Sequence, residues 1–211
     1  QRTVAIARRT AYHGVTLGAL ALTGVPAMKE PFGAPAIDVV HAATTNAYRP
    51  EVADPVADVE RAVAEAGPEN VAMIIAEPVQ NSGGCLVPPD GYWPALREIC
   101  DRIGALLVAD EVITGFGRLG SWLGGERYAA DPDLVTFAKG LTAAYAPMGG
   151  VLVREEVAEP LFDAGRTLLH GVTFGGHPMC AAVALEVLDI FESEHVLENV
   201  QALEGHLASR L

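Results

Sequence analysis

Short apolar runs alternate with amphipathic segments along most of the chain. The runs, which are typical of strands buried on both faces, are Val4–Arg8, Val71–Ala76, Ala105–Ala109, Leu134–Ala138 and Gly150–Arg154. Strands that alternate with helices predict an α/β fold, in which a mostly parallel sheet is flanked by helices. The chain contains no internal repeat and no low-complexity linker.

Helix start and stop signals separate these strands. Four helices are predicted, from Pro55 to about Ala66, from the segment 90–94 to about Arg102, from about Glu155 to Ala164, and from Pro178 to about Ser193. The chain opens within a strand pattern and closes within a helical one. We therefore expect both ends to be cuts through a larger protein.

Composition narrows the range of functions. Half of the 211 residues are apolar, which is enough for one sizeable core and predicts one domain. The formal net charge of -13 argues against binding to nucleic acid or to an anionic membrane surface. The three cysteines are far apart without zinc-site spacing, and no apolar run or signal peptide indicates a membrane or secreted protein. A cytoplasmic location is expected.

Ionisable residues stand at or just beyond the ends of the predicted strands. Glu77 follows the second run, Asp110 and Glu111 follow the third, and Lys139 follows the fourth. Strand carboxyl ends meet at one edge of a parallel sheet, and a buried charge is costly there unless it is paired. Glu77, Asp110 and Lys139 together therefore predict a functional site at this edge.

Lys139 is one of only two lysines in the chain, and it directly follows an apolar run. On a strand, the adjacent Asp110 and Glu111 point to opposite faces, whereas Asp110 and Val112 share a face that can hold a flat heteroaromatic ring. An apolar pocket formed partly by Leu134–Ala138 would lower the pKa of Lys139 and leave its amine free to bond to an aldehyde. Pyridoxal phosphate requires such a lysine and such a carboxylate.

Other motifs in the sequence do not point to a second functional site. Residues 115–120 match the glycine pattern of dinucleotide-binding folds, but no strand-to-helix turn is predicted there, so a loop is favoured. No serine lies in a hydrolase elbow, and the histidines have no metal-site spacing. Arg118 is equally compatible with binding a substrate carboxylate and with a surface ion pair.

Several motifs along the chain belong together. The chain resembles the class III (omega-type) aminotransferases, which have the type I fold of pyridoxal-phosphate enzymes, in AYHG (11–14), AEPVQNSGG (76–84), LLVADEVITGFGRLG (106–120), PDLVTFAKGLTAAYAPMGG (132–150) and HGVTFGGHP (170–178). The resemblance extends over essentially all of residues 1–211 and is most specific where DEVITGFGR precedes the AKG lysine. It implies that the chain is the central part of the large, cofactor-binding domain.

The resemblance also implies roles for individual residues. Lys139 would form the Schiff base with pyridoxal 5'-phosphate, and Asp110 would hold its ring nitrogen. Tyr12 and Val112 would contact the two ring faces, and Glu77 would lie near Asp110 on the substrate side. His13 and Gly14 complete the implied cofactor-binding set.

Thr173 would bind the cofactor phosphate of a neighbouring subunit, which implies a homodimer. The implied reaction transfers an amino group from an amine or ω-amino acid to a keto acid such as pyruvate, with Lys139 moving the proton. A decarboxylase, racemase or aminomutase on the same scaffold, or a catalytically inert fragment, are the alternatives. The family's upstream phosphate loop and first strand, and its small domain, have no counterpart here, so we expect little transaminase activity from this chain alone.

Overall fold

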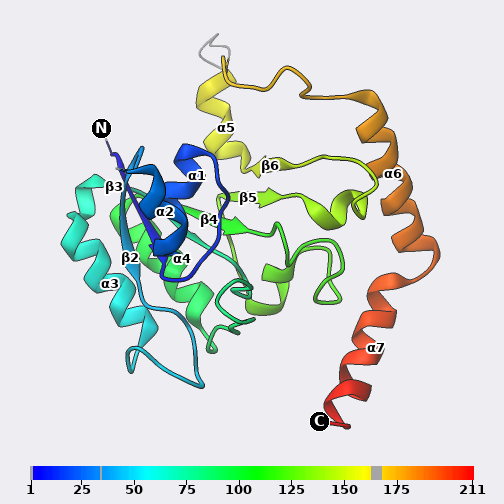
Figure 1. Ribbon diagram of the computed structural model, residues 1–211, viewed down its shortest axis with the longest axis horizontal. Coiled ribbons are helices and arrows are strands. Elements are labelled where there is room, and N and C mark those ends of the chain that lie inside the picture. The colour runs from blue at the N-terminus through cyan, green and yellow to red at the C-terminus, as the bar shows by residue number, and fades with distance from the viewer. Residues whose placement is uncertain (1, 34, 163–167) are drawn as a thin grey trace. The chain divides into compact units, whose positions relative to one another are not determined.

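The computed structural model describes residues 2–33, 35–162 and 168–211, and the chain divides into two compact units (Figure 1). The first unit comprises Gln1–Asp110 and Tyr128–Pro132. The second comprises Glu111–Arg127 and Asp133–Leu211.

A parallel sheet forms the centre of the first unit. Its strands, in the spatial order β2-β1-β3-β4, are β2 (Asp38–Ala42), β1 (Val4–Arg8), β3 (Val71–Ala76) and β4 (Leu106–Asp110), and all three pairings are parallel. Most residues of β1, β3 and β4 are buried, as their continuous apolar runs predict.

Helices cover this sheet. The helical elements of the first unit are α1 (Leu17–Leu22), α2 (Pro26–Lys29), η1 (Glu30–Phe32), α3 (Pro55–Ala66), η2 (Pro68–Asn70) and α4 (Tyr92–Ile103). The long helices α3 and α4 contact each other and pack on the strands (Figure 1). The Asp54 side chain caps α3 by accepting from two backbone N–H groups, and Gly104 ends α4 in the left-handed conformation.

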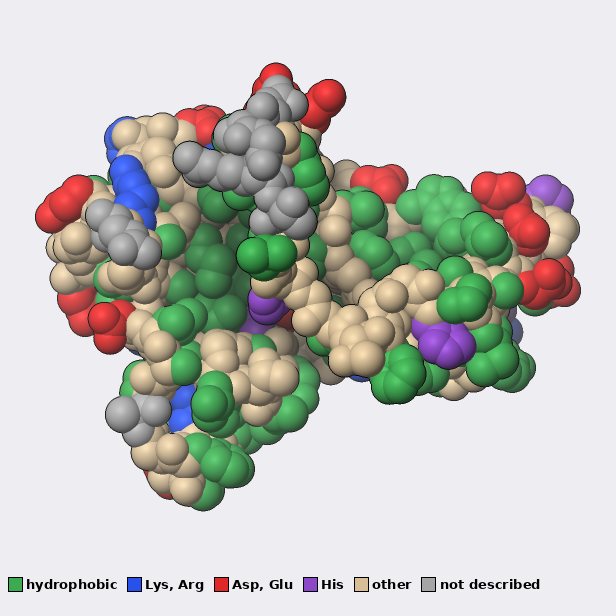
Figure 2. Space-filling model, turned by 90° about the horizontal axis from the view of Figure 1, so that it is seen from above, with side chains coloured by type: hydrophobic (Ala, Val, Ile, Leu, Met, Phe, Trp, Pro, Cys, Tyr) green, Lys and Arg blue, Asp and Glu red, His purple; other side chains and the backbone are tan. Residues whose placement is uncertain are grey.

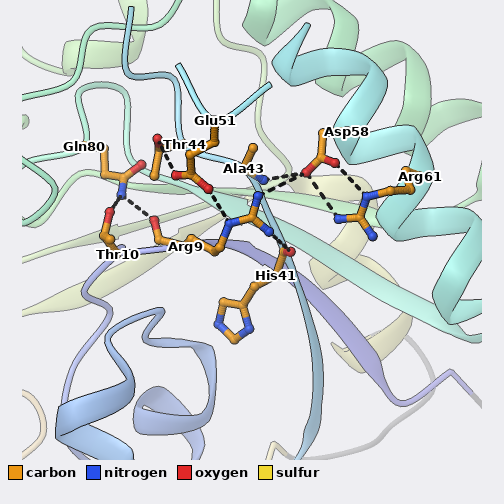
Figure 3. A network of polar contacts seen from close by, with 9 residues as sticks. All are labelled: Arg9, Thr10, His41, Ala43, Thr44, Glu51, Asp58, Arg61 and Gln80. Atoms are coloured by element: carbon orange, nitrogen blue, oxygen red, sulfur yellow. Dashed lines mark hydrogen bonds and ion pairs between the residues drawn. The ribbon is translucent and has the colours of Figure 1, made fainter. Parts of the chain in front are cut away.

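A polar network ties α3 to the ends of β1 and β2 (Figure 3). Arg9, which follows β1, donates from Nε to Glu51 Oε2 at 2.5 Å, and its Nη2 lies 3.8 Å from Asp58 Oδ2. Asp58 Oδ2 also accepts from the buried Ala43 N–H at 2.6 Å, and Oδ1 accepts from Arg61 Nε at 2.6 Å. The network therefore fixes the segment after β2 against the first turns of α3.

The second unit contains an antiparallel strand pair and three long helices. These elements are β5 (Leu134–Phe137), β6 (Gly150–Val153), the short helix η4 (Lys139–Thr142), α5 (Glu155–Phe162), α6 (Pro178–Ser193) and α7 (Val196–Ala208). A further short helix, η3 (Gly124–Tyr128), reaches the boundary between the units. Helix α6 packs on η4 and α7. Hydrophobic side chains of α6 and α7, such as Leu185 and Leu203, remain exposed. Figure 2 shows hydrophobic side chains on the surface of the molecule.

The predicted α/β class, with a mostly parallel sheet flanked by helices, is confirmed. Two strands, Val4–Arg8 and Val71–Ala76, match their predicted bounds, as do helices Pro55–Ala66 and Pro178–Ser193. The third predicted strand lies one residue further along the chain, at Leu106–Asp110, and the last two end one residue earlier than predicted. The helix predicted for residues 155–164 is described to Phe162, and its last two positions lie outside the described residues.

Strand β2 was not predicted, because its pattern is weak. It begins with an exposed aspartate and only Ala42 is buried, as expected for a strand at the edge of the sheet. Within the described ranges, no helix is long and apolar enough to cross a membrane.

Candidate functional site

Each unit holds part of the predicted site. The first unit contains Tyr12, His13, Gly14, Glu77 and Asp110, and the second contains Val112, Lys139 and Thr173.

Asp110 is the last residue of β4, and its carboxylate is paired. Its Oδ2 lies 2.7 Å from His13 Nδ1, and the two side chains are 7% and 1% exposed. A carboxylate only accepts hydrogen bonds, so the imidazole donates from Nδ1. His13 in turn is fixed by its own backbone N–H, which donates to Thr23 Oγ1 at 3.0 Å. The structure thus brings together two residues that lie 97 positions apart.

The other imidazole nitrogen of His13, Nε2, is buried and has no hydrogen-bond partner among the described residues. Buried polar atoms normally have one. A buried carboxylate that is held by a buried imidazole is an acceptor that fits the protonated nitrogen of a heteroaromatic ring, as the predicted cofactor requires.

Glu77 directly follows β3 and is also paired. Its Oε2 accepts from Arg8 Nη2 at 3.0 Å, and its main-chain oxygen accepts from the same nitrogen at 2.6 Å. Its Oε1 accepts from the Tyr12 N–H at 3.4 Å. Two predicted site residues, Glu77 and Tyr12, are therefore linked directly in the first unit.

Arg8 is a site residue that the sequence does not predict. It ends an apolar strand, yet its side chain is only 2% exposed. A buried arginine is almost always paired. The sequence signal for Arg8 is its charge at the end of an otherwise apolar run.

Lys139 begins η4 with a positive φ of 38°, directly after β5 and Ala138. The lysine is exposed, and of the predicted apolar run only Val135 is buried. The run therefore encloses the amine less than the sequence predicts. The Schiff-base role of Lys139 stays a prediction.

The strand argument that linked Val112 to Asp110 was wrong. Because β4 ends at Asp110, Val112 lies in a turn, where the alternation of side chains between sheet faces does not apply. Its contact with the cofactor rests on the resemblance alone.

Glu111 has a structural role that the sequence did not reveal. Its carboxylate is 1% exposed and accepts from Thr114 Oγ1 at 2.5 Å and from the N–H groups of Gly124 and Gly125 at 2.9 and 2.7 Å. These bonds close the loop that carries the glycine pattern of residues 115–120. Residues 112–119 are turns, so the pattern does not form the strand-to-helix turn of a dinucleotide site, in agreement with the prediction.

Thr173 is exposed and lies in the segment before α6. Its contact with a neighbouring subunit stays a prediction. Arg118 is exposed on the glycine-rich loop. Among the described residues, no group of three or more His, Cys, Asp or Glu side chains is placed to hold a metal ion.

Comparison with known families agrees with these motifs. The family model described as aminotransferase class-III matches residues 1–211. The chain belongs to the class III aminotransferases. The sheet with its flanking helices matches part of the type I fold of pyridoxal-phosphate transaminases.

Individual proteins that are similar to this chain are also aminotransferases. The chain is 45% identical to the putrescine–pyruvate aminotransferase of Pseudomonas aeruginosa, covering 96% of this chain and 46% of that protein. It is 38% identical to a probable gamma-aminobutyrate transaminase of Oryza sativa, covering 94% of this chain and 41% of that protein. The crystal structure of an (S)-enantioselective omega-transaminase from Thermomicrobium roseum matches with a TM-score of 0.87 and 46% identity, over 92% of this chain and 45% of that one. The chain thus spans less than half the length of these relatives.

Proposed function

We propose that the protein is a pyridoxal-phosphate-dependent aminotransferase, which moves an amino group from an amine or ω-amino acid to a keto acid such as pyruvate. The observation that carries the proposal is the buried Asp110–His13 pair at the carboxyl end of the parallel sheet. Relatives named for putrescine, pyruvate and gamma-aminobutyrate support this choice of substrates.

Each residue of the site has a task in this proposal. Asp110 keeps a proton on the ring nitrogen, and His13 holds the Asp110 carboxylate in place. Tyr12 supports one ring face. Lys139 Nζ would anchor the cofactor and, once the amino group of the donor has replaced it there, would accept the proton from the α-carbon of the donor. When bound, pyridoxal phosphate supplies the electron sink that stabilises the deprotonated carbon.

The proposed working unit is a cytoplasmic homodimer, in which Thr173 of one subunit contacts the cofactor phosphate in the other. The exposure of Thr173 is compatible with such a contact. Its hydroxyl would donate to a phosphate oxygen.

The chain offers a sharp test of the anchor, because Lys139 and Lys29 are its only lysines. The protein is mixed with pyridoxal phosphate, reduced with borohydride to make any Schiff base permanent, and mapped by mass spectrometry. We expect the label on Lys139, its loss in Lys139→Ala, and its retention in the matched control Lys29→Ala. A label on Lys29 or on the chain's amino terminus alone would contradict the assignment.

The reaction class is tested separately. A transaminase consumes the donor amine only when a keto acid is present, whereas a racemase or decarboxylase needs no acceptor. We expect consumption of putrescine or gamma-aminobutyrate to depend on added pyruvate. Repeated consumption without an acceptor, beyond one donor per bound cofactor, would exclude transamination. The chain covers less than half of its relatives, so we expect little turnover by residues 1–211 alone, and all activity tests use a full-length protein that contains these residues.

A further inference from the structure

Arg8 is a buried arginine that forms an ion pair with Glu77. We propose that Arg8 is a positioning residue, which fixes the Glu77 carboxylate and through it the backbone of Tyr12. The inference rests on the proposed function, because that function gives Glu77 and Tyr12 their place beside the cofactor.

The contacts of Arg8 converge on one residue of the neighbouring strand. Its Nη2 donates both to the main-chain oxygen of Glu77 at 2.6 Å and to Glu77 Oε2 at 3.0 Å. Because β1 and β3 are adjacent parallel strands, this double contact joins their carboxyl ends. It holds both the backbone and the side chain of Glu77.

Tyr92 stabilises this arrangement from the start of α4. Arg8 Cζ lies 5.9 Å from the centre of the Tyr92 ring, and the tyrosine is 1% exposed. Burial raises the pKa of the Tyr92 hydroxyl, so the tyrosine is neutral at ordinary pH. Tyr92 therefore lies against the guanidinium as a neutral side chain and does not replace Glu77 as its anion.

The two carboxylate oxygens of Glu77 accept hydrogen bonds from different residues. Oε2 accepts from Arg8, which leaves Oε1 facing the Tyr12 N–H at 3.4 Å. Without the guanidinium, a carboxylate that is 9% exposed loses its charged partner and its fixed rotamer. The Tyr12 amide then loses its acceptor, and the segment that carries Tyr12 and His13 loosens.

Arg9 is a natural control for Arg8. The two arginines are adjacent, but Arg9 is 40% exposed and pairs with Glu51 and Asp58, in the network that ties β2 to α3 (Figure 3). The substitution Arg9→Lys removes the same guanidinium group without affecting a contact of Glu77.

Hydrogen exchange of the Tyr12 amide tests the proposal in the chain without cofactor. We expect Arg8→Lys, Arg8→Met and Glu77→Gln each to speed this exchange by about tenfold relative to amides in the centre of β3, whereas Arg9→Lys leaves it unchanged. If Arg8→Met does not fold, Arg8→Lys and Glu77→Gln provide the same comparison. Unchanged Tyr12 exchange in folded Arg8→Lys would overturn the proposal.

A double-mutant cycle with cofactor separates positioning from general stability. The dissociation constant for pyridoxal phosphate is measured by fluorescence in Arg8→Lys, in Glu77→Gln and in the double variant. If Arg8 acts through Glu77, Arg8→Lys weakens binding by roughly tenfold in the wild-type background and has little further effect when Glu77 is already changed. Independent, multiplying losses would refute the coupling. Failure of the wild-type protein to bind the cofactor would instead contradict the proposed function and leave the exchange result standing.

Discussion

Asp110 and Glu111 are adjacent buried carboxylates with different hydrogen-bond partners. Asp110 is a buried carboxylate whose Oδ2 contacts an imidazole nitrogen, while its neighbour Glu111 is a buried carboxylate whose oxygens accept from a threonine hydroxyl and two glycine N–H groups. The first environment suits a ring nitrogen, and the second suits a loop clamp.

Substitution of Asp110 should therefore affect catalysis more than folding. Asp110→Asn keeps the shape but removes the charge that stabilises a protonated ring nitrogen, and we expect the transamination rate to fall by about 100-fold. Asp101→Asn, an exposed change in α4, should leave the rate unchanged. Initial rates of pyruvate-dependent amine consumption measure both. Equal rates for Asp110→Asn and the wild-type protein would remove Asp110 from the site.

Substitution of Glu111 should affect folding instead. Glu111→Ala leaves the buried N–H groups of Gly124 and Gly125 without their acceptor, and we expect a loss of about 3 kcal/mol in the free energy of unfolding. Urea unfolding of Glu111→Ala, compared with the exposed Glu156→Ala in α5, measures the difference. A loss below that of the control would show that the loop does not depend on this carboxylate.

At the scale of elements, the turn after β1 depends on a glycine. A Cβ at Gly24 would lie 2.1 Å from the main-chain oxygen of Arg8 and 2.8 Å from the Thr10 nitrogen, so backbone would have to move. We expect Gly24→Ala to destabilise the protein by about 2 kcal/mol or more. Gly18→Ala is the control, because a Cβ there meets no atom within 4 Å in helix α1 and should stabilise by about 0.5 kcal/mol. Thermal unfolding should shift in opposite directions for the two variants.

The junction between β2 and α3 should respond to pH. The hydrogen bonds from Arg61 and from the Ala43 N–H lower the pKa of Asp58 in the folded protein, against the effect of burial. A lowered pKa means that the ionised carboxylate stabilises the fold fully above its ordinary value of about 3.9 and loses this effect as the pH falls through the folded value.

Asp58→Asn should remove that pH-dependent part. We expect the variant to be less stable than the wild-type protein at pH 7 by about 2 kcal/mol, with the difference narrowing as the pH falls below about 4. Urea unfolding across this range measures the gap. A gap that stays constant or widens at low pH would contradict the assignment.

The sequence predicted the elements best where both faces of a strand are buried. The apolar runs at Val4–Arg8 and Val71–Ala76 matched β1 and β3, whereas the half-exposed edge strand β2 had no comparable pattern. The end of β4 also matters for the site. Because β4 ends at Asp110 and Val112 lies in a turn, strand alternation cannot assign Val112 to a face.

The candidate site was predictable as a list of strand-end residues, but not as a set of contacts. Glu77 and Asp110 were found from their position after buried runs. Their partners Arg8 and His13 depend on strand register over 69 and 97 positions, which local patterns do not encode. The sequence showed that these charges needed partners, and the fold determined which residues these were.

At the scale of the whole molecule, the proposed dimer makes Thr173 and Lys139 residues of different subunits at any one site. This arrangement predicts complementation. A Lys139→Ala subunit has no anchor, and a Thr173→Val subunit gives its partner no phosphate contact. In a mixed dimer of the two variants, one site carries both defects, and the other keeps Lys139 from one subunit and Thr173 from its partner.

Mixing the two variants at equal concentration should therefore restore activity that neither possesses alone. Random exchange makes about half of the dimers mixed, each with one intact site, so about a quarter of wild-type activity is expected, and less where exchange is incomplete. Mixing Lys139→Ala with Lys139→Arg is the control and should restore nothing, because no site then contains the lysine. If Thr173 served its own subunit, the mixed dimer would have no intact site. Subunit exchange that is shown by differential tagging, without recovery of activity, would therefore overturn the placement of Thr173 across the interface.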